Sequence, residues 1–227
     1  MYNISIFIHN NSRDKQSQND METKVEVFFM AANFKNSVTK DNLMRAFAGE
    51  SQARNRYIFA AQQAKKAKLQ VIESVFTYTA NQETAHARVF YKHLKELAGE
   101  TIYVDGGYPV DISDDVGKLL RMAQHNEYQE HDDVYRSFGE KAKEEGFLQV
   151  ANSFFMIAEI EKIHGDRFGR FADLLDNKGL FKENGTTKWI CLNCGYVCEG
   201  DAAPDKCPVC YHDKGYFIRF KDSPFIS

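Results

Sequence analysis

The sequence predicts a mainly α-helical protein in which a bundle of four long helices is followed by a small cysteine-rich domain. Three observations lead to this prediction. Apolar residues recur at steps of three and four along four long segments between residues 40 and 175. The chain contains only four prolines and is rich in Ala, Glu, Lys and Gln, which favour helix. All five cysteines lie within residues 191–210, so the two parts of the chain differ in composition.

Composition and charge narrow the class of protein. A length of 227 residues suits one sizeable domain plus a small one, and 43% hydrophobic residues is typical of a soluble globular chain. The net charge of −3 and the lack of a basic stripe disfavour nucleic-acid binding. No apolar run is long enough to span a bilayer, so no membrane partner is expected. Clustered CxxC cysteines indicate a metal site in a reducing compartment, which predicts a cytoplasmic protein.

The first 36 residues are predicted to be a disordered extension. They have a short apolar patch followed by a polar stretch, MYNISIFIHNNSRDKQSQND. A secretory signal would need a basic start and a longer apolar region, and neither is present. An alternative is that translation begins at Met30.

The first two predicted helices run from Lys40 to about Ala67 and from Leu69 to Leu97, with Gly99 ending the second. The face of the first helix comprises Leu43, Phe47, Glu50, Arg54, Tyr57, Ala61 and Ala64. The face of the second comprises Ile72, Phe76, Thr79, Glu83, His86, Phe90, Leu94 and Leu97. Both faces therefore carry ionisable residues where a core is expected to be apolar.

The third and fourth helices show the same feature. Gly106, Gly107 and Pro109 mark a long connection, and Ser113 is a plausible start for the third helix. Its face comprises Val116, Leu120, Ala123, Glu127, Glu130, Val134 and Phe138. Gly146 breaks the chain, and the fourth face comprises Ala151, Phe154, Ala158, Glu161, His164, Phe168 and Phe171. Four such helices predict a four-helix bundle.

The ionisable residues on these faces form an internal repeat. The motif Glu-x-x-His occurs once in the second helix and once in the fourth. The matching positions are 77 or 78 residues apart: Glu50 and Glu127, Glu83 and Glu161, His86 and His164. The chain therefore consists of two related helical hairpins followed by the cysteine-rich domain.

The repeat predicts a metal centre. A buried carboxylate costs several kcal/mol unless it is paired or binds a metal, and several at one depth would repel one another. Residues at i and i+3 share a helix face, so each Glu-x-x-His presents an oxygen and a nitrogen to one centre. Two such motifs with two further glutamates are the di-iron pattern of ferritin-like bundles. One such motif alone would more often be a solvated helix face; the recurrence at one offset favours the metal.

Three further groups of residues accompany this pattern. Glu130 has no repeat partner, since Ala53 is at the matching position, so spacing alone makes it a weaker ligand candidate. Tyr57 and Tyr135 are placed to donate hydrogen bonds to ligand carboxylates, with aromatic core filling as the alternative. The remaining helix histidines are interpreted as surface residues or as residues that support a ligand without binding the metal: His93, His125 and His131.

The cysteines form a second predicted metal site. In WICLNCGYVCEGDAAPDKCPVC, two CxxC pairs predict one tetrahedral thiolate site, comprising Cys191, Cys194, Cys207 and Cys210. Zinc would make it a structural ribbon, and a single iron would make it a one-electron carrier. Iron is favoured because the knuckles CGY and CPVC are similar to those of rubredoxin, and because aromatic residues could shield the site: Trp189, Tyr196, Tyr211, Tyr216 and Phe217. Cys198 lies on neither knuckle and is interpreted as a bystander, with a redox-active thiol as the alternative.

Residues 37 to about 222 resemble rubrerythrin. The resemblance is carried by AFAGESQARNRY, ETAH, NEYQE, IEKIH and CLNCGY…CPVC, in that order. It implies a ferritin-like di-iron bundle over residues 37–175, a linker over 176–188 and a rubredoxin-like domain over 189–222.

The resemblance also implies an activity and its residues. Proteins of this family are expected to reduce hydrogen peroxide to water, with the rubredoxin-type iron of the four cysteines passing electrons singly to the di-iron centre. The implied catalytic and metal-binding residues are Glu50, Glu83, His86, Glu127, Glu130, Glu161 and His164. Among them Glu83 and Glu161 would bridge the irons, and His86 and Glu130 would exchange on one iron with redox state.

The expected partners follow from the same resemblance. The electron donor would be a rubredoxin or a reductase that uses reduced nicotinamide nucleotide. The assembly would be a head-to-tail homodimer or a higher homo-oligomer, because the two metal sites within one subunit would be too far apart. The role would be protection from oxidative stress in the cytoplasm of an anaerobe or microaerophile.

Three other functions are compatible with parts of the sequence. An iron-storage protein would share the bundle but have no use for a cysteine domain, and would form a large hollow assembly. A di-iron oxidase or oxygenase would react faster with oxygen than with peroxide. A zinc-ribbon binding protein would be colourless and would leave seven buried polar residues unexplained.

Overall fold

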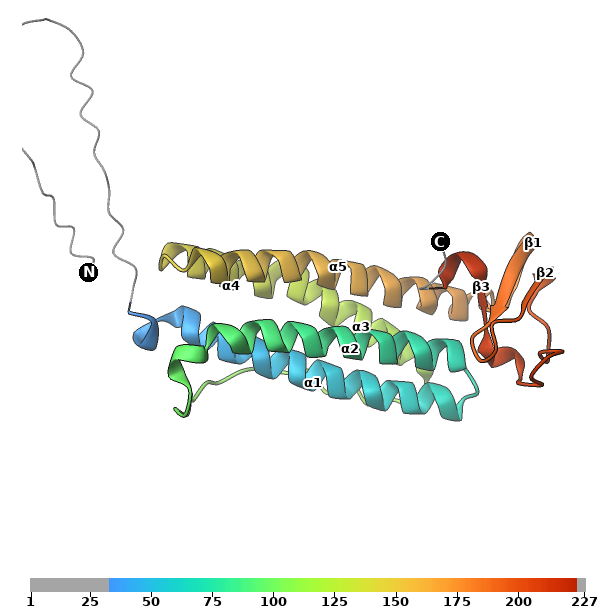
Figure 1. Ribbon diagram of the computed structural model, residues 1–227, viewed down its shortest axis with the longest axis horizontal. Coiled ribbons are helices and arrows are strands. Elements are labelled where there is room, and N and C mark those ends of the chain that lie inside the picture. Colours follow the sequence, from blue (N-terminus) through green and yellow to red (C-terminus); the bar gives the residue numbers. More distant parts are fainter. Residues whose placement is uncertain (1–32, 224–227) are drawn as a thin grey trace, which may run out of the picture.

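Long helices lie side by side, and a small sheet caps one end of them (Figure 1). The computed structural model describes residues 33–223. The elements in chain order are η1 (Phe34–Asn36), α1 (Val38–Lys66), α2 (Gln70–His93), η2 (Lys95–Leu97), α3 (Val116–Gln129), η3 (Glu130–Val134), α4 (Tyr135–Glu144), α5 (Leu148–Asp176), β1 (Lys182–Cys191), β2 (Val197–Ala202), η4 (Lys214–Tyr216), β3 (Phe217–Arg219) and η5 (Phe220–Asp222). The predicted bundle followed by a small domain is confirmed.

The helix ends follow local sequence signals. The Ser37 hydroxyl accepts a hydrogen bond from the amide of Lys40 at 3.0 Å and caps α1. Asp115 caps α3, two residues after the predicted start at Ser113. Gly99 and Gly146 have φ values of +88° and +86°, a left-handed backbone that ends a helix and favours glycine.

The helices α3 and α4 form one continuous rod, the third of the bundle, and the π-helical turn η3 interrupts it. The predicted apolar face continued through Val134 and Phe138, but the structure buries Tyr135 and Gly139 instead. A π turn takes in one extra residue, so it shifts the buried face by one position. The same residue explains why the repeat offset is 77 at Glu127 and 78 at every later position.

Two buried clusters related by the repeat lie on either side of the ionisable residues. In one, the rings of Tyr57, Phe76 and Phe168 lie 5.0–6.0 Å apart between centroids. In the other, the rings lie 4.9–5.9 Å apart and are those of Tyr135, Phe154 and Phe90. All three pairs of equivalent positions differ by 78 residues. One predicted face position is wrong, since Arg54 is exposed and Ala53 is buried in its place.

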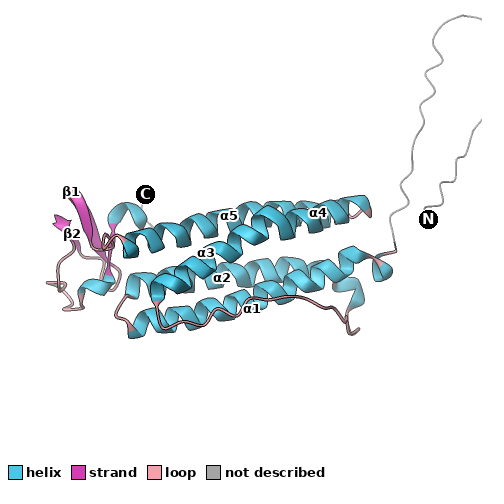
Figure 2. Cartoon of the chain, turned by 180° about the vertical axis from the view of Figure 1, so that it is seen from behind, coloured by secondary structure: helices cyan, strands magenta, loops and turns pink. Residues whose placement is uncertain are grey.

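The connection between η2 and α3 runs back along the bundle beside α1 (Figure 2). Two ion pairs attach it to α1, Arg45 to Asp105 and Arg56 to Asp111. The hydroxyl of Tyr108 also donates to the carbonyl of Arg45 at 3.1 Å. The connection therefore covers this side of α1 instead of forming a free loop.

The C-terminal domain is an antiparallel sheet in the order β2-β1-β3. The prediction of a tethering linker over 176–188 differs from the structure, because β1 already begins at Lys182. Arg219, only 4% exposed, donates to the carbonyls of Gly179, Leu180 and Lys182. Its Nε also donates to Glu183 at 2.7 Å. One buried guanidinium thus fixes the chain that joins the two domains.

The domain also packs directly on the bundle. Leu180 and Ile218 belong to the buried cluster that contains Tyr57. A methyl group at Gly215 would collide with the carbonyl oxygen of Lys68, in the turn between α1 and α2. This close approach requires glycine, so the domain sits against the bundle end in a defined place.

The predicted N-terminal extension falls mostly outside the described residues. Phe34–Asn36, which we included in it, form η1, and the Phe34 ring packs edge-on against Phe147 at 5.3 Å. Among residues 33–223, no helix combines the length and apolarity that crossing a bilayer requires.

Candidate metal centres

Ionisable side chains from all four rods meet in one layer between the two aromatic clusters. Each side chain is buried, and the layer consists of Glu50 on α1, Glu83 and His86 on α2, Glu127 on α3, and Glu161 and His164 on α5. The helix period places Glu and His of each Glu-x-x-His motif on the same inward face. The structure therefore brings together six of the seven predicted bundle residues.

Two glutamates occupy the centre of this layer. His86 Nδ1 lies 3.0 Å from Glu83 Oε2 and 2.9 Å from Glu161 Oε1. His164 Nδ1 lies 3.0 Å from Glu83 Oε1 and 2.8 Å from Glu161 Oε2. Each of these two carboxylates therefore has one oxygen near His86 and the other near His164. A ligand that bridges two metal ions needs this arrangement.

The remaining two glutamates lie at the ends. Glu50 Oε2 is 3.8 Å from His86 Nδ1, and Glu127 Oε2 is 3.8 Å from His164 Nδ1. The layer divides into two overlapping groups that share Glu83 and Glu161, each with four ligand atoms within 4.8 Å of one another. Two adjacent cations with shared carboxylates fit this division.

The polar atoms themselves support the presence of cations. Despite the short distances, most of them meet no partner in hydrogen-bond geometry among the described residues. These atoms are Glu50 Oε2, both carboxylate oxygens of Glu83 and Glu161, Glu127 Oε2, His86 Nδ1, and both ring nitrogens of His164. Buried lone pairs that converge without donors are costly, and a metal ion would satisfy them. The residues present therefore fit a di-metal centre.

The charges of the layer are strongly coupled. Burial, followed by the charges of Glu161 and Glu83, raises the pKa of Glu50 well above its usual value, and burial raises the pKa of Glu127 to about 8. Burial alone would lower the pKa of His86, but Glu161 and Glu83 raise it to about 9. Without a metal, the layer therefore holds protons that a divalent cation would displace.

Two buried tyrosines connect the halves of the repeat. Tyr57 on α1 donates a hydrogen bond to Glu127 Oε1 on α3. Tyr135 on α4 donates to Glu50 Oε1 on α1 at 2.5 Å. Each hydroxyl leaves the other oxygen of its carboxylate for a metal, so these tyrosines can orient the two end ligands.

Glu130 lies apart from the layer. It is the first residue of η3, it is half-buried, and it belongs to neither ligand group. Its backbone N–H donates to the carbonyls of Asn126 and Glu127, but its carboxylate forms no hydrogen bond or ion pair with another described residue. Burial, followed by the charge of Glu127, raises the pKa of Glu130 well above its usual value. In this structure His86 therefore lies in the layer and Glu130 beside it.

One polar group near the layer gave no signal in the sequence. Arg56, beside Tyr57, pairs with Asp111 of the connection, and Asn126 donates to the same carboxylate at 2.7 Å. The Arg56 guanidinium lies 5.5 Å from the centre of the Tyr57 ring. Only the fold brings Asp111 to this place, so helical periodicity could not have identified the group.

The three other helix histidines and the fifth cysteine belong to none of these ligand groups. His93 contacts the Ser153 hydroxyl at 2.9 Å, and His131 pairs with Asp132 at 2.6 Å. His125 is exposed. Cys198 lies on β2 opposite Trp189 and is not part of the cysteine group.

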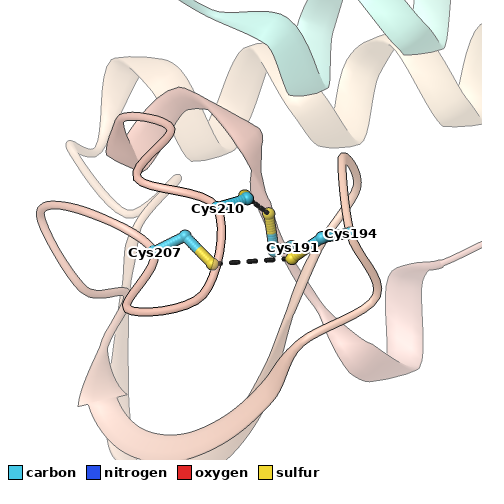
Figure 3. Close-up of side chains that lie close together, drawn as sticks. All are labelled: Cys191, Cys194, Cys207 and Cys210. Atoms are coloured by element: carbon cyan, nitrogen blue, oxygen red, sulfur yellow. Dashed lines mark hydrogen bonds between the residues drawn. The ribbon is translucent and has the colours of Figure 1, made fainter.

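The four predicted cysteines converge at the end of the sheet (Figure 3). The sulfur atoms of Cys191 and Cys210 lie 3.7 Å apart, and those of Cys194 and Cys207 lie 3.6 Å apart. Two knuckles facing each other at this separation fit one tetrahedral metal ion. Of the aromatic residues expected to shield the site, four pack there: Trp189, Tyr196, Tyr216 and Phe217. Tyr211 does not, since it is exposed.

Comparison with known proteins covers both sites. A rubrerythrin family model matches residues 41–172, and a model of the rubrerythrin rubredoxin-like domain matches residues 189–218. Rubrerythrin of Clostridium perfringens is 41% identical over 190 residues, which are 83% of this chain and 97% of that protein. Rubrerythrin of Nitratidesulfovibrio vulgaris is 40% identical over 183 residues, 81% of this chain and 94% of its own.

The fold comparison agrees with the sequence matches. The solved structure of fully reduced, all-ferrous nigerythrin has a TM-score of 0.55 at 26% identity, and covers 92% of this chain and 100% of its own. The chain therefore belongs to the rubrerythrin family, whose members combine a di-iron centre with a rubredoxin-like site in which four cysteines bind one iron.

Proposed function

We propose that the protein is a non-haem di-iron peroxidase that reduces hydrogen peroxide to water, with electrons relayed through the cysteine-bound iron. The observation that carries this proposal is the layer of buried, unpartnered carboxylate and imidazole atoms in the same chain as a four-cysteine site. A peroxidase supplied by a one-electron carrier needs both a place for two-electron chemistry and a route for single electrons. The two sites are suited to these two tasks.

The bundle residues would hold the metal pair and keep it dry. When bound, two ferrous ions supply both electrons needed to cleave the O–O bond of peroxide. Glu83 and Glu161 would bridge them, and the histidines and end glutamates would complete each side. The hydroxyls of Tyr57 and Tyr135 hold the end carboxylates in place. The aromatic clusters above and below exclude water from the layer.

Glu130 and His86 are proposed to exchange on one side of the layer. Two oxidised irons carry two more positive charges than the reduced pair, so a further carboxylate would be stabilised beside them. Glu130 is one helical turn from Glu127, and it has no competing ion pair in the described chain. The π turn at Glu130 interrupts the regular hydrogen bonding of the helix there, which favours local adjustment.

Electron transfer is proposed to occur between subunits. From Glu161 to Asp176 the α5 helix extends for 15 residues, or roughly 22 Å at 1.5 Å per residue. The cysteine site lies beyond that end, and Arg219 and Gly215 fix the domain there. A swinging domain is therefore a poor relay. A head-to-tail homodimer, with a rubredoxin or nicotinamide-dependent reductase as donor, would bring unlike sites together in the cytoplasm of an anaerobe or microaerophile.

The test is rapid mixing of the anaerobically reduced protein with peroxide or with oxygen, while the visible spectrum reports both iron sites. The proposal predicts fast reoxidation by peroxide and slow reoxidation by oxygen. The reverse preference would indicate an oxidase. A large hollow assembly in a size measurement, with iron mineral inside, would indicate storage instead.

A further inference from the structure

Arg56 is a largely buried cation with one donor nitrogen left over. Its side chain is only 11% exposed. Its Nε donates to Gln52 at 2.6 Å, and its Nη1 donates to Asp111. The third nitrogen, Nη2, is buried and has no hydrogen-bond partner among the described residues. A buried donor on a charged group is costly to leave unpaired, so this nitrogen is available to an acceptor that the present arrangement does not supply.

Glu130 carries an acceptor in the matching situation, and Asp111 connects the two residues. The Glu130 carboxylate belongs to neither ligand group and pairs with no other described residue. Asp111 accepts from Arg56 on one side and from Asn126 of α3, at 2.7 Å, on the other. The backbone N–H of Glu130 donates to the carbonyl of Asn126, so Glu130 lies one turn further along the same helix face. The guanidinium is thus held beside the turn that carries Glu130.

The charge of Arg56 acts on Glu130. Burial, followed by the charges of Glu127, Glu161 and Glu83, raises the pKa of Glu130, whereas the charge of Arg56 lowers it. Arg56 therefore stabilises the ionised carboxylate in its position beside the layer. The carboxylates of the layer have the opposite effect, because like charges repel. An ionised Glu130 that leaves the metals would accordingly need a counter-charge, and Arg56 is placed to supply it.

We infer that Arg56 is a positioning residue that receives the Glu130 carboxylate when this carboxylate leaves the iron pair. The inference rests on the proposed function, because it needs Glu130 to exchange with His86. Beside oxidised iron, Glu130 would be a ligand, and Arg56 would keep Asp111 as its charged partner. Beside reduced iron, Arg56 Nη2 would donate to the detached carboxylate, directly or through one water. The electrons come from the donor, and Arg56 changes only where Glu130 lies. By stabilising the detached carboxylate, Arg56 favours the reduced pair and raises its reduction potential.

The test is an anaerobic redox titration of the iron-loaded protein without peroxide. The double variant R56M/D111N removes the ion pair with no change in net charge, so its direct electrostatic effect on the metals is small. A hydrogen bond between charged groups changes an equilibrium constant by about tenfold or more. We therefore expect the two-electron potential of the bundle irons to fall by at least about 30 mV, the equivalent of that factor. R56K keeps the charge and should keep most of the potential. The control R45M/D105N removes the other ion pair between the connection and α1, and should leave the potential unchanged.

Glu130 decides whether Arg56 acts through it. In the E130Q background there is no carboxylate to receive, so E130Q alone should raise the potential and R56M/D111N should add no further change. An equal fall of the potential with and without E130Q would overturn the inference while leaving the exchange and the peroxidase proposal intact. An unchanged potential in E130Q alone would overturn the exchange and the inference together. No peroxide enters these measurements, so failure of the peroxidase proposal would leave their result intact.

Crystal structures of the two redox states provide a check that needs no variant. In the reduced wild-type protein we expect Arg56 Nη2 to lie within about 3 Å of the Glu130 carboxylate, or to share one water with it. In the oxidised protein the two groups should be apart. A reduced structure in which Glu130 has left the metals but has no contact with Arg56 would overturn the inference. Glu130 still on the metal in the reduced protein would overturn the exchange as well.

Discussion

The bundle and the C-terminal domain hold their candidate ligands in opposite surroundings. In the bundle, four helices bury every carboxylate and imidazole of the layer between aromatic clusters. In the small domain, two loops hold four cysteines, and Cys194 reaches the surface. A sealed site favours chemistry on a small substrate without interference from water. An open site favours single-electron exchange with a large partner. Under the proposed function, the sealed site would carry out the reaction and the open site would supply the electrons.

The largest expected effect comes from removing a central carboxylate of the bundle. E161A takes one oxygen from each half of the layer, because Glu161 faces both His86 and His164. We expect loss of both bundle irons and a fall in peroxide turnover of at least about a thousandfold. Metal analysis should find the cysteine-bound iron retained. E159A on the same helix is the control, since Glu159 is exposed and pairs with Arg136. Retention of bundle iron in E161A would contradict the assigned bridge.

The reciprocal change removes the open site alone. C207A deletes a buried cysteine ligand, so the ferric-thiolate absorption should disappear and donor-driven turnover should stop. A single oxidation of the chemically reduced bundle by peroxide should survive. C198S is the matched control and should leave the spectrum unchanged. An altered spectrum in C198S would mean that this cysteine takes part in the site.

The tyrosines test whether the two halves of the bundle are equivalent. Y57F and Y135F each remove one hydrogen bond to an end carboxylate. Loss of such a partner typically costs about 10- to 100-fold in metal affinity or activity, and we expect comparable losses in both variants. Activity titrated against added ferrous ion measures this. An effect in Y57F alone would show that only the Glu127 side, next to Glu130, depends on its tyrosine.

The metal-free bundle should respond to pH in two opposite ways. The folded-state pKa values of His86, about 9, and Glu127, about 8, are both raised above their unfolded values. The folded protein therefore binds more protons, so its metal-free stability should fall as pH rises from about 6.5 to about 9. Metal affinity should rise over the same range, because protons compete with the ion. Thermal unfolding with and without metal tests both expectations, the fall in metal-free stability and the rise in metal affinity. A metal-free stability that rises with pH would contradict the first.

The smallest expected effect concerns how the two regions are joined. G215A places a methyl group against the Lys68 carbonyl, so the domain should shift from the bundle end at a cost of about 1–3 kcal/mol. G107A is the control, as its added methyl group would have no neighbour within 4 Å. Limited proteolysis near residues 177–181 should be faster in G215A. Equal cleavage in both variants would show that the packing does not restrain the domain.

Helical periodicity and the repeat were sufficient to predict the bundle and the residues of its polar layer. The offset of 77 or 78 located Glu50, Glu83 and Glu161 because ligands on the inward face of repeated helices keep their spacing. Periodicity failed where the backbone departs from the regular helix, so the face beyond Glu130 was displaced by one residue.

Local sequence patterns could not predict contacts between segments that are distant along the chain. The linker looked flexible because its composition is rich in turn residues, but its restraint comes from Arg219, some 40 positions away along the chain. Arg56 and Asp111 are likewise joined only by the fold. The exposed position of Tyr211 follows from the left-handed turn of the second knuckle, which a CxxC spacing does not specify.

The most direct test of the account is a single turnover of the fully reduced protein with peroxide, with both iron spectra followed in time. The account predicts that the bundle irons oxidise first and that the cysteine-bound iron follows, and that in E161A the cysteine-bound iron stays reduced. Direct oxidation of that iron by peroxide, at the wild-type rate in E161A, would contradict the division of work between the two sites.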